Sequence, residues 1–312
     1  MAIDLVSVNS ESKNKKVNPI IIGIILIIII SITSCVIFMI KGINDYNEMK
    51  HMQLTWTEIQ NIADSEPENP KDIVSEVIDE EGNKVQVIPE NQDDDLYRQL
   101  NLTGLYNVNN DVSGYIYIPG TKVNYPILKE SEPNKYYYLN HNMNLEYDKY
   151  GSIFEISDEE RGLPELDNAV NVIFGHHMAS GAMFTGLYGY YNQETRDEYI
   201  DKPIYIYRSN VRTEYRVAAL CIVKENDIVY DFDAYGRDSE NYQILLDHIN
   251  EVKVKDIEFN QPLPTTSDDM LVLSTCYGRS GTAWRLIVIC SEYRKAIVPN
   301  DYNTLGDNQI NE

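Results

Sequence analysis

One cysteine, one histidine and one arginine each stand where an apolar, strand-like run meets a polar stretch. Cys276 ends one such run, His176 follows a second run directly after a glycine, and Arg285 begins a third. A thiol nucleophile, a proton carrier and a fixed cation are the groups that acyl transfer through a thioester requires. The sequence therefore indicates an enzyme of peptide or acyl transfer.

Each of these residue types has a defined part in such a reaction. Only a thiolate attacks a carbonyl carbon, and a free cysteine with a pKa of about 8.5 is mostly protonated at neutral pH. His176 can give a proton to a leaving amine and take one from an incoming amine. Arg285 stays charged at any physiological pH, which suits stabilisation of a developing oxyanion.

Neighbouring residues offer competing interpretations. A cysteine at a strand end is more often a packed small residue, but the polar residues before Cys276 and the glycine-containing loop after it favour an accessible thiol. Strand alternation sends His176 and His177 to opposite faces, so they cannot serve a site equally. Arg279 is an alternative cation whose loop position indicates a mobile surface charge, and His141 lies in a loop without an assigned role.

Three further residues are candidates for substrate binding. Ser274 and Thr275 precede the cysteine and can line a substrate groove, although core packing is an equal alternative for Thr275. Tyr188 lies in a tyrosine-rich helical segment after the histidine motif, where a packed surface helix is the alternative. No acidic cluster has the spacing of a metal-binding loop, so we expect no metal and no required cofactor.

The other cysteines have simpler explanations. Cys35 lies in a long apolar run, and Cys221 and Cys290 lie inside apolar segments, where they are typical of small core residues. No Cys-x-x-Cys pair is present, so the sequence suggests neither a zinc site nor a disulfide framework.

The candidate residues sit among many short strand-like segments separated by turn residues. These segments cover residues 115–118, 123–128, 151–156, 169–174, 203–207, 214–223, 270–275 and 285–292. Helical spacing of apolar residues interrupts them at 186–192 and 239–252, and a short helix is expected near 96–105. This pattern predicts a mainly β fold, a closed or nearly closed eight-stranded β-barrel with flanking helices.

The N-terminal region carries a separate signal. Residues 19–40 form an isoleucine-rich run without a charge, long enough to span the hydrocarbon core of about 30 Å. Lysines precede it, which predicts a single-pass transmembrane helix with a cytoplasmic N-terminus, residues 1–18, and an extracellular body. A cleaved signal peptide is the alternative, and residues 32–35 resemble a lipoprotein processing site, but the apolar run continues beyond Cys35.

Composition separates the rest of the chain into a spacer, a folded domain and a tail. Residues 41–94 are rich in acids and contain three prolines, which predicts a membrane-proximal spacer, with a helix over 45–62 and a small hairpin over 74–88. Residues 95–298 form the predicted catalytic domain, and 299–312 a polar tail. The formal net charge of −23 would repel phosphates, so we expect no nucleic-acid partner.

The motifs, taken in order, resemble the sortases of Gram-positive bacteria. The sequence Val-Leu-Ser-Thr-Cys276 resembles the family's Thr-Leu-x-Thr-Cys signature, with Val272 in place of the leading threonine. Gly-His176 and Arg285 stand where the family has its histidine and arginine. The string from Gly175 to Phe184 resembles class B sortases in particular, and the resemblance covers residues 95–295.

This resemblance implies a sortase-like barrel and a cysteine transpeptidase anchored in the cell membrane. Cys276 would cleave a C-terminal sorting signal of secreted proteins through a thioacyl-enzyme. An amine of a peptidoglycan precursor or of a pilin subunit would then accept the acyl group. His176 would transfer protons, and Arg285 would hold the substrate backbone or the oxyanion.

Two alternatives remain open from the residues alone. A surface cysteine protease or amidase would use the same cysteine and histidine, with water as the acceptor. A membrane-anchored wall-binding module without activity would leave Cys276 unreactive towards alkylating reagents. The sorting signal, the amine acceptor, the choice between single-protein anchoring and pilus polymerisation, and the oligomeric state are not determined by the sequence.

Overall fold

The structure is a computed structural model in two compact units, Met1–Leu54 and Thr55–Glu312. It describes residues 18–67, 73–78, 84–87, 93–130, 136–156, 169–231, 234–278 and 281–298. Arg279, the tail 299–312 and the first seventeen residues therefore lie outside the described residues.

One long helix, α1 (Pro19–Ala63), contains the predicted transmembrane segment. The helix continues past residue 40 because the polar sequence that follows has no proline, and the single Gly42 costs only about 1 kcal/mol. Its side chains from Ile20 to Ile40 are apolar around the whole helix and mostly exposed. By length and composition, α1 is suited to crossing a membrane.

The end of α1 belongs to the second compact unit. The Trp56 ring meets the Tyr125 ring edge-on, with 5.2 Å between centroids, and Gln60 donates to the carbonyl oxygen of Asn124 over 2.9 Å. Ile59 is buried as well. This compact unit thus begins at Thr55, before the residue 95 expected from composition, because these apolar side chains find partners on a barrel strand.

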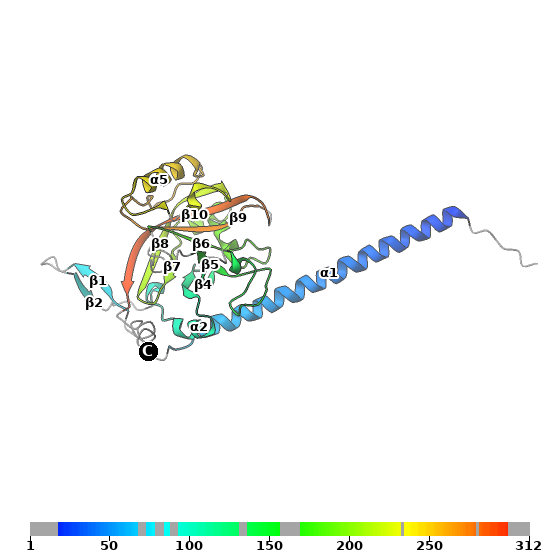
Figure 1. The fold of residues 1–312 in the computed structure, drawn as a ribbon, viewed down its shortest axis with the longest axis horizontal. Coiled ribbons are helices and arrows are strands. Elements are labelled where there is room, and N and C mark those ends of the chain that lie inside the picture. Colours follow the sequence, from blue (N-terminus) through cyan, green and yellow to red (C-terminus); the bar gives the residue numbers. More distant parts are fainter. Residues whose placement is uncertain are drawn as a thin grey trace, which may run out of the picture. The chain divides into compact units, whose positions relative to one another are not determined.

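Eight strands form a closed barrel, which confirms the predicted fold. They are β3 (Val112–Tyr117), β4 (Asn124–Glu130), β5 (Ile153–Ile156), β6 (Val170–Phe174), β7 (Ile204–Tyr207), β8 (Val211–Lys224), β9 (Met270–Cys276) and β10 (Trp284–Ile297). Around the barrel the order is β10-β8-β7-β3-β4-β5-β6-β9 (Figure 1). The β4–β5 and β6–β9 pairs are parallel and the other pairs are antiparallel.

Short helices and a hairpin surround the barrel. The helices are α2 (Leu102–Val108), α3 (Tyr188–Tyr191), α4 (Arg196–Tyr199) and α5 (Glu240–Val252), with 3-10 turns η1 (Asp95–Tyr97), η2 (Tyr137–Leu139), η4 (Phe184–Leu187) and η5 (Ile228–Tyr230). The hairpin predicted over 74–88 is present as two antiparallel strands, β1 (Ser75–Ile78) and β2 (Lys84–Val87).

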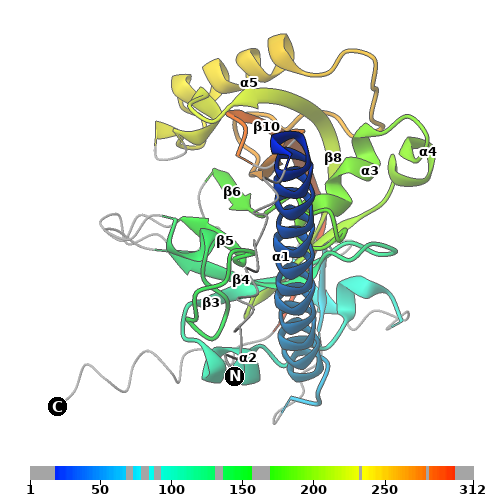
Figure 2. The same cartoon turned by 90° about the vertical axis from the view of Figure 1, so that its right-hand side faces the viewer.

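Helix α5 covers the outer face of β8, β9 and β10 (Figures 1 and 2). It starts where the Ser239 side chain accepts a hydrogen bond from the Tyr242 N–H, and Tyr242, Leu245, Leu246 and Ile249 are its buried residues. These pack with outward-facing side chains such as Val272 and Ile287. On β9 the residues on either side of Val272, Leu271 and Leu273, are also buried, and strand alternation turns them to the barrel interior.

Candidate functional site

Strand register brings the three predicted chemical residues into one row. Cys276 on β9 is the direct antiparallel partner of Arg285 on β10, and opposite residues of an antiparallel pair project to the same face. On the other side, Phe174 of β6 is level with Ser274 of β9, and the Gly175 N–H donates to the Ser274 carbonyl oxygen over 3.1 Å. Two residues further along this parallel pair, His176 reaches the level of Cys276.

The row lies on the face that α5 covers further along the strands. Val272, Ser274 and Cys276 alternate onto this face, and Val272 belongs to the core beneath α5. Helix α5 does not extend over Cys276, which is half-buried and is not in a disulfide. The family's leading threonine is replaced by Val272 at a fully buried position, where an apolar side chain packs without needing a hydrogen-bond partner.

The imidazole of His176 is oriented by a backbone group. Its Nε2 lies 2.7 Å from the Leu139 carbonyl oxygen. A carbonyl oxygen only accepts, so Nε2 carries the proton and Nδ1 is the nitrogen left for proton exchange. The loop that presents Leu139 is itself held, because the buried Glu130 carboxyl accepts hydrogen bonds from the backbone N–H groups of Tyr136 and Tyr138.

The guanidinium of Arg285 is held at the end of β10. It donates through Nη1 to the carbonyl oxygens of Thr282 and Trp284, and Nη2 lies 2.8 Å from a carboxylate oxygen of Glu225. The Tyr277 N–H, directly after the cysteine, already donates to the Trp284 carbonyl oxygen over 2.9 Å. Arg285 therefore has donors left on Nε and Nη2, whereas the Tyr277 N–H, the first backbone N–H after Cys276, is engaged in the sheet.

The candidate substrate-binding residues have different positions. Ser274 faces the same side as Cys276 but is buried, with 2% of its surface exposed, and its hydroxyl lies 2.8 Å from the Tyr230 hydroxyl. Thr275 points to the barrel interior and is buried, which agrees with its core-packing interpretation and not with groove lining. Tyr188 reaches the site from α3, where its hydroxyl contacts backbone atoms of Cys276 and Gly278.

An aromatic row that the sequence did not reveal extends from Ser274. We define it as Tyr136, Phe154, Phe174 and Tyr230. The Phe174 ring stacks on Phe154 and on Tyr230, with centroids 5.3 and 5.9 Å apart, and Tyr136 meets it edge-on. Burial raises the pKa of Tyr230 to about 12, so its hydroxyl stays protonated and available for hydrogen bonding.

The other histidines named from the sequence have local packing partners. The His177 ring stacks on the Tyr188 ring at 4.1 Å, and burial lowers its pKa. The His141 ring stacks on Tyr137 at 3.8 Å and its Nδ1 lies 2.8 Å from the Tyr137 carbonyl oxygen. Of the three, His176 lies two residues after Phe174, the β6 residue paired with Ser274, while His177 also contacts the backbone of Gly278.

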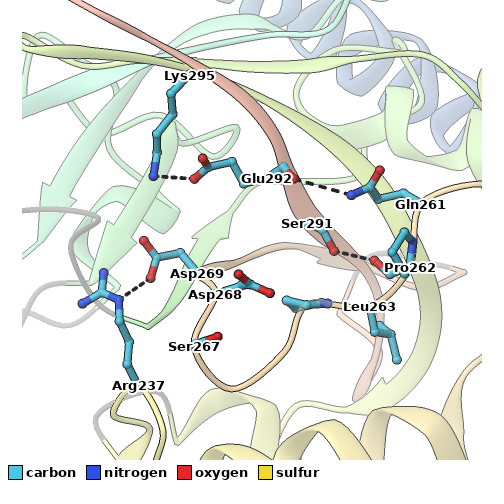
Figure 3. Close-up of a pocket in the computed structure, with 11 residues that line it drawn as sticks. Arg237, Gln261, Pro262, Leu263, Ser267, Asp268, Asp269, Ser291, Glu292 and Lys295 are labelled. Carbon is cyan, nitrogen blue, oxygen red and sulfur yellow. Dashed lines mark hydrogen bonds and ion pairs between the residues drawn. The ribbon is translucent and has the colours of Figure 1, made fainter. Parts of the chain in front are cut away.

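A cavity of about 330 Å³ lies at the other end of β9 (Figure 3). It is lined by Asp268 and Asp269, just before the strand, whereas Cys276 ends the strand about 20 Å away. Figure 3 shows two ion pairs in its lining, Arg237 with Asp269 and Lys295 with Glu292. This cavity holds none of the predicted site residues. Among the described residues, no group of three or more His, Cys, Asp or Glu side chains could hold a metal ion.

Comparison with known proteins identifies the family. Residues 116–293 match the Sortase domain. Sortase B of Staphylococcus aureus is 30% identical over 190 residues, which are 59% of this chain and 71% of that protein. Sortase B of Listeria monocytogenes is 27% identical over 175 residues, 56% of this chain and 66% of that protein.

Solved structures agree with this match. A Staphylococcus aureus sortase B–substrate complex has a TM-score of 0.50 and 25% identity, covering 62% of this chain and 85% of that one. Sortase B from B. anthracis has a TM-score of 0.57 over 80% of this chain and 99% of its own, and at 20% identity it supports the fold alone. Since the domain match spans more than half of the sequence, the chain belongs to the sortase family of cysteine transpeptidases and resembles its class B members.

Proposed function

We propose that this protein is a membrane-anchored class B sortase that cleaves a C-terminal sorting signal and joins the new carboxyl end to an amine. The observation that carries the proposal is that Cys276 on β9 pairs with Arg285 on β10, while His176 follows β6 two residues beyond Phe174, the partner of Ser274. The proposal is further supported by the family match, in which a nucleophilic cysteine is a shared property.

In the first half-reaction, the Cys276 thiolate attacks the carbonyl carbon at the scissile peptide bond. The carbonyl oxygen becomes an oxyanion, which the free donors of Arg285 stabilise. The carbon–nitrogen bond then breaks, and His176, which holds the proton of the Cys276 thiol on Nδ1, gives that proton to the departing amine. The product is a thioester between the substrate and Cys276.

In the second half-reaction, an amine attacks the thioester carbonyl. His176 takes the proton of the incoming amine, the carbon–sulfur bond breaks and Cys276 leaves as a thiolate. The acceptor is an amine of a peptidoglycan precursor or of a pilin subunit. Water at the same step would make the protein a hydrolase, so the acceptor decides between transpeptidase and protease.

The exposed side of the aromatic row is the surface on which we place the sorting signal. Tyr136, which is 49% exposed, offers an apolar ring, and the partly buried Tyr230, whose hydroxyl bonds the buried Ser274, offers a polar contact. The apolar helix α1 would anchor the enzyme with its N-terminus in the cytoplasm and the barrel outside the cell.

A peptide assay on the full chain in detergent micelles tests this function. Quenched peptides carrying candidate sorting signals are incubated with and without an amine, and intact mass is followed. We expect a thioacyl adduct on wild type and an amine-linked product. Cleavage that yields only hydrolysed peptide at every amine concentration would favour the protease, and an enzyme whose Cys276 resists iodoacetamide would favour the wall-binding module.

A further inference from the structure

The hydroxyl of Tyr188 bridges two backbone groups directly after the candidate nucleophile. It donates to the carbonyl oxygen of Cys276 over 2.9 Å and accepts from the N–H of Gly278 over 2.9 Å. A phenol has one hydrogen and two lone pairs, so both bonds form at once. These two groups belong to successive peptide units, one on each side of Tyr277.

The Tyr188 ring packs against the histidine segment as well as against Tyr277 of this segment. Tyr188 begins α3, and its ring lies between those of His177 and Tyr277, with centroids 4.1 and 6.5 Å away and interplanar angles of 22° and 6°. It is therefore packed on both faces. The position of the hydroxyl is therefore set by α3, by the His177 ring and in part by Tyr277, so Tyr188 links the segment after β9 to α3 and to the histidine segment.

The chain needs such a support where it leaves the sheet. The Tyr277 N–H makes the last backbone bond to β10, and Gly278 adopts a φ of +77°, which favours glycine. The peptide unit after Cys276 therefore carries one bond to the sheet and one to Tyr188. The next peptide unit is tied through its N–H to Tyr188 and through its carbonyl oxygen to the Thr282 hydroxyl.

We propose that Tyr188 is a positioning residue that fixes the backbone after Cys276 and thereby the direction of the thiol. This inference rests on the proposed function of Cys276 as the nucleophile. It also revises the expectation from sequence that Tyr188 binds substrate, because its hydroxyl is already used by the enzyme's own backbone. Misplacement of a reacting group by about 1 Å costs about a hundredfold in rate.

Tyr188→Phe tests the proposal, with Tyr191→Phe as the matched control. Tyr191 lies on the same short helix and in the same aromatic cluster, but its hydroxyl bonds the Tyr277 hydroxyl over 3.0 Å and not the backbone of residues 276–278. In Tyr188→Phe we expect the acylation rate constant to fall by about tenfold to a hundredfold, with KM little changed. In Tyr191→Phe it stays within about threefold. The rate constant, unlike the yield of adduct, reports only on folded molecules.

Two further measurements separate positioning from substrate binding and from failure of the proposed function. In a Cys276→Ala background, Tyr188→Phe should leave peptide affinity unchanged; a weakened affinity would assign Tyr188 to substrate binding and overturn the proposal. Amide hydrogen exchange at Gly278 should accelerate in Tyr188→Phe but not in Tyr191→Phe, whether or not any peptide reacts. Unchanged exchange at Gly278, or equal acylation rates in the two variants, would refute the positioning role.

Discussion

Two arginine–glutamate pairs on this barrel have the same chemistry and opposite surroundings. Arg208 and Glu155 face each other through two hydrogen bonds of 3.1 and 3.0 Å, with only 8% and 4% of their side chains exposed, and Ser113 donates to the same carboxylate. Arg285 and Glu225 share one bond of 2.8 Å, and the Glu225 side chain is 57% exposed.

The difference indicates which pair holds the fold and which can be exchanged. Removing one partner of a buried ion pair leaves the other charge buried without compensation, so Arg208 and Glu155 are needed together as a link between β5 and the end of β7. An exposed pair contributes little free energy, so a substrate carbonyl can replace Glu225 at the Arg285 guanidinium at small cost. The second region is therefore the one suited to catalysis.

The largest effect should come from the thiol of that region. Cys276→Ala should abolish the thioacyl adduct and lower acyl transfer by at least about a thousandfold, since no other nucleophile lies in the row. Cys221→Ala is the control, because Cys221 is buried and its burial raises the thiol pKa to about 12. Intact mass and product formation are the readouts. An adduct that survives in Cys276→Ala would place the nucleophile elsewhere.

The second largest effect should fall on stability at the buried pair. Glu155→Gln leaves the Arg208 guanidinium buried without a counter-charge, so we expect the free energy of unfolding to drop by about 3–5 kcal/mol. Denaturant unfolding measures this. The double variant Arg208→Met with Glu155→Met should recover most of the loss, because it removes both charges. A single variant as stable as wild type would show that the pair is hydrated in solution.

Arg285 should affect rate more than stability. Arg285→Ala should lower kcat by about a hundredfold to a thousandfold, the range for losing one oxyanion donor. Arg285→Lys keeps the charge but not the planar fork, so it should recover only part of the rate. Both variants should lose much less stability than Glu155→Gln, since an ion pair with the exposed Glu225 contributes at most about 1 kcal/mol and each lost bond to a carbonyl oxygen adds about 1 kcal/mol. A large loss of stability in Arg285→Ala would show that Arg285, like Arg208, is needed to hold the fold.

Glu130 should make the stability of the protein depend on pH. Burial, opposed by backbone hydrogen bonds from Tyr136 to Tyr138, raises its pKa from 4.5 to about 7. The folded state then holds a proton that the unfolded state releases, so this carboxyl favours folding most below pH 4.5 and this contribution is lost as pH rises to about 7. Glu130→Gln should remove that decline. The free energy of unfolding is measured at pH 5 and pH 8 for the variant and for wild type. An equal change between the two pH values in both proteins would contradict the assignment to Glu130.

The sequence predicted the barrel strands well, and the partners of the candidate site residues poorly. Alternation and turn residues placed all eight barrel strands, and the motifs placed His176, Cys276 and Arg285 at strand ends. Local patterns do not encode register, so the pairing of Cys276 with Arg285 appears only in the sheet. The Leu139 carbonyl that orients His176 has no residue signature at all, because every residue carries one. Glu225 and Tyr230 were missed for a related reason: their partners lie more than forty residues away along the chain.

The smallest effect should come from the exposed carboxylate. Glu225→Gln keeps a hydrogen-bonding side chain but removes the negative charge that partly neutralises Arg285. The guanidinium should then attract a developing oxyanion more strongly, and we expect kcat/KM to rise by less than about fivefold, since exposed pairs are worth at most about 1 kcal/mol. The rise should shrink as salt is added, because salt screens exposed charges. Glu292→Gln, at the exposed Lys295 pair by the cavity, is the control for general loss of negative charge. A hundredfold fall in kcat/KM for Glu225→Gln would mean that this carboxylate holds Arg285 in its working position, and the exposed pair would then be as necessary as the buried one.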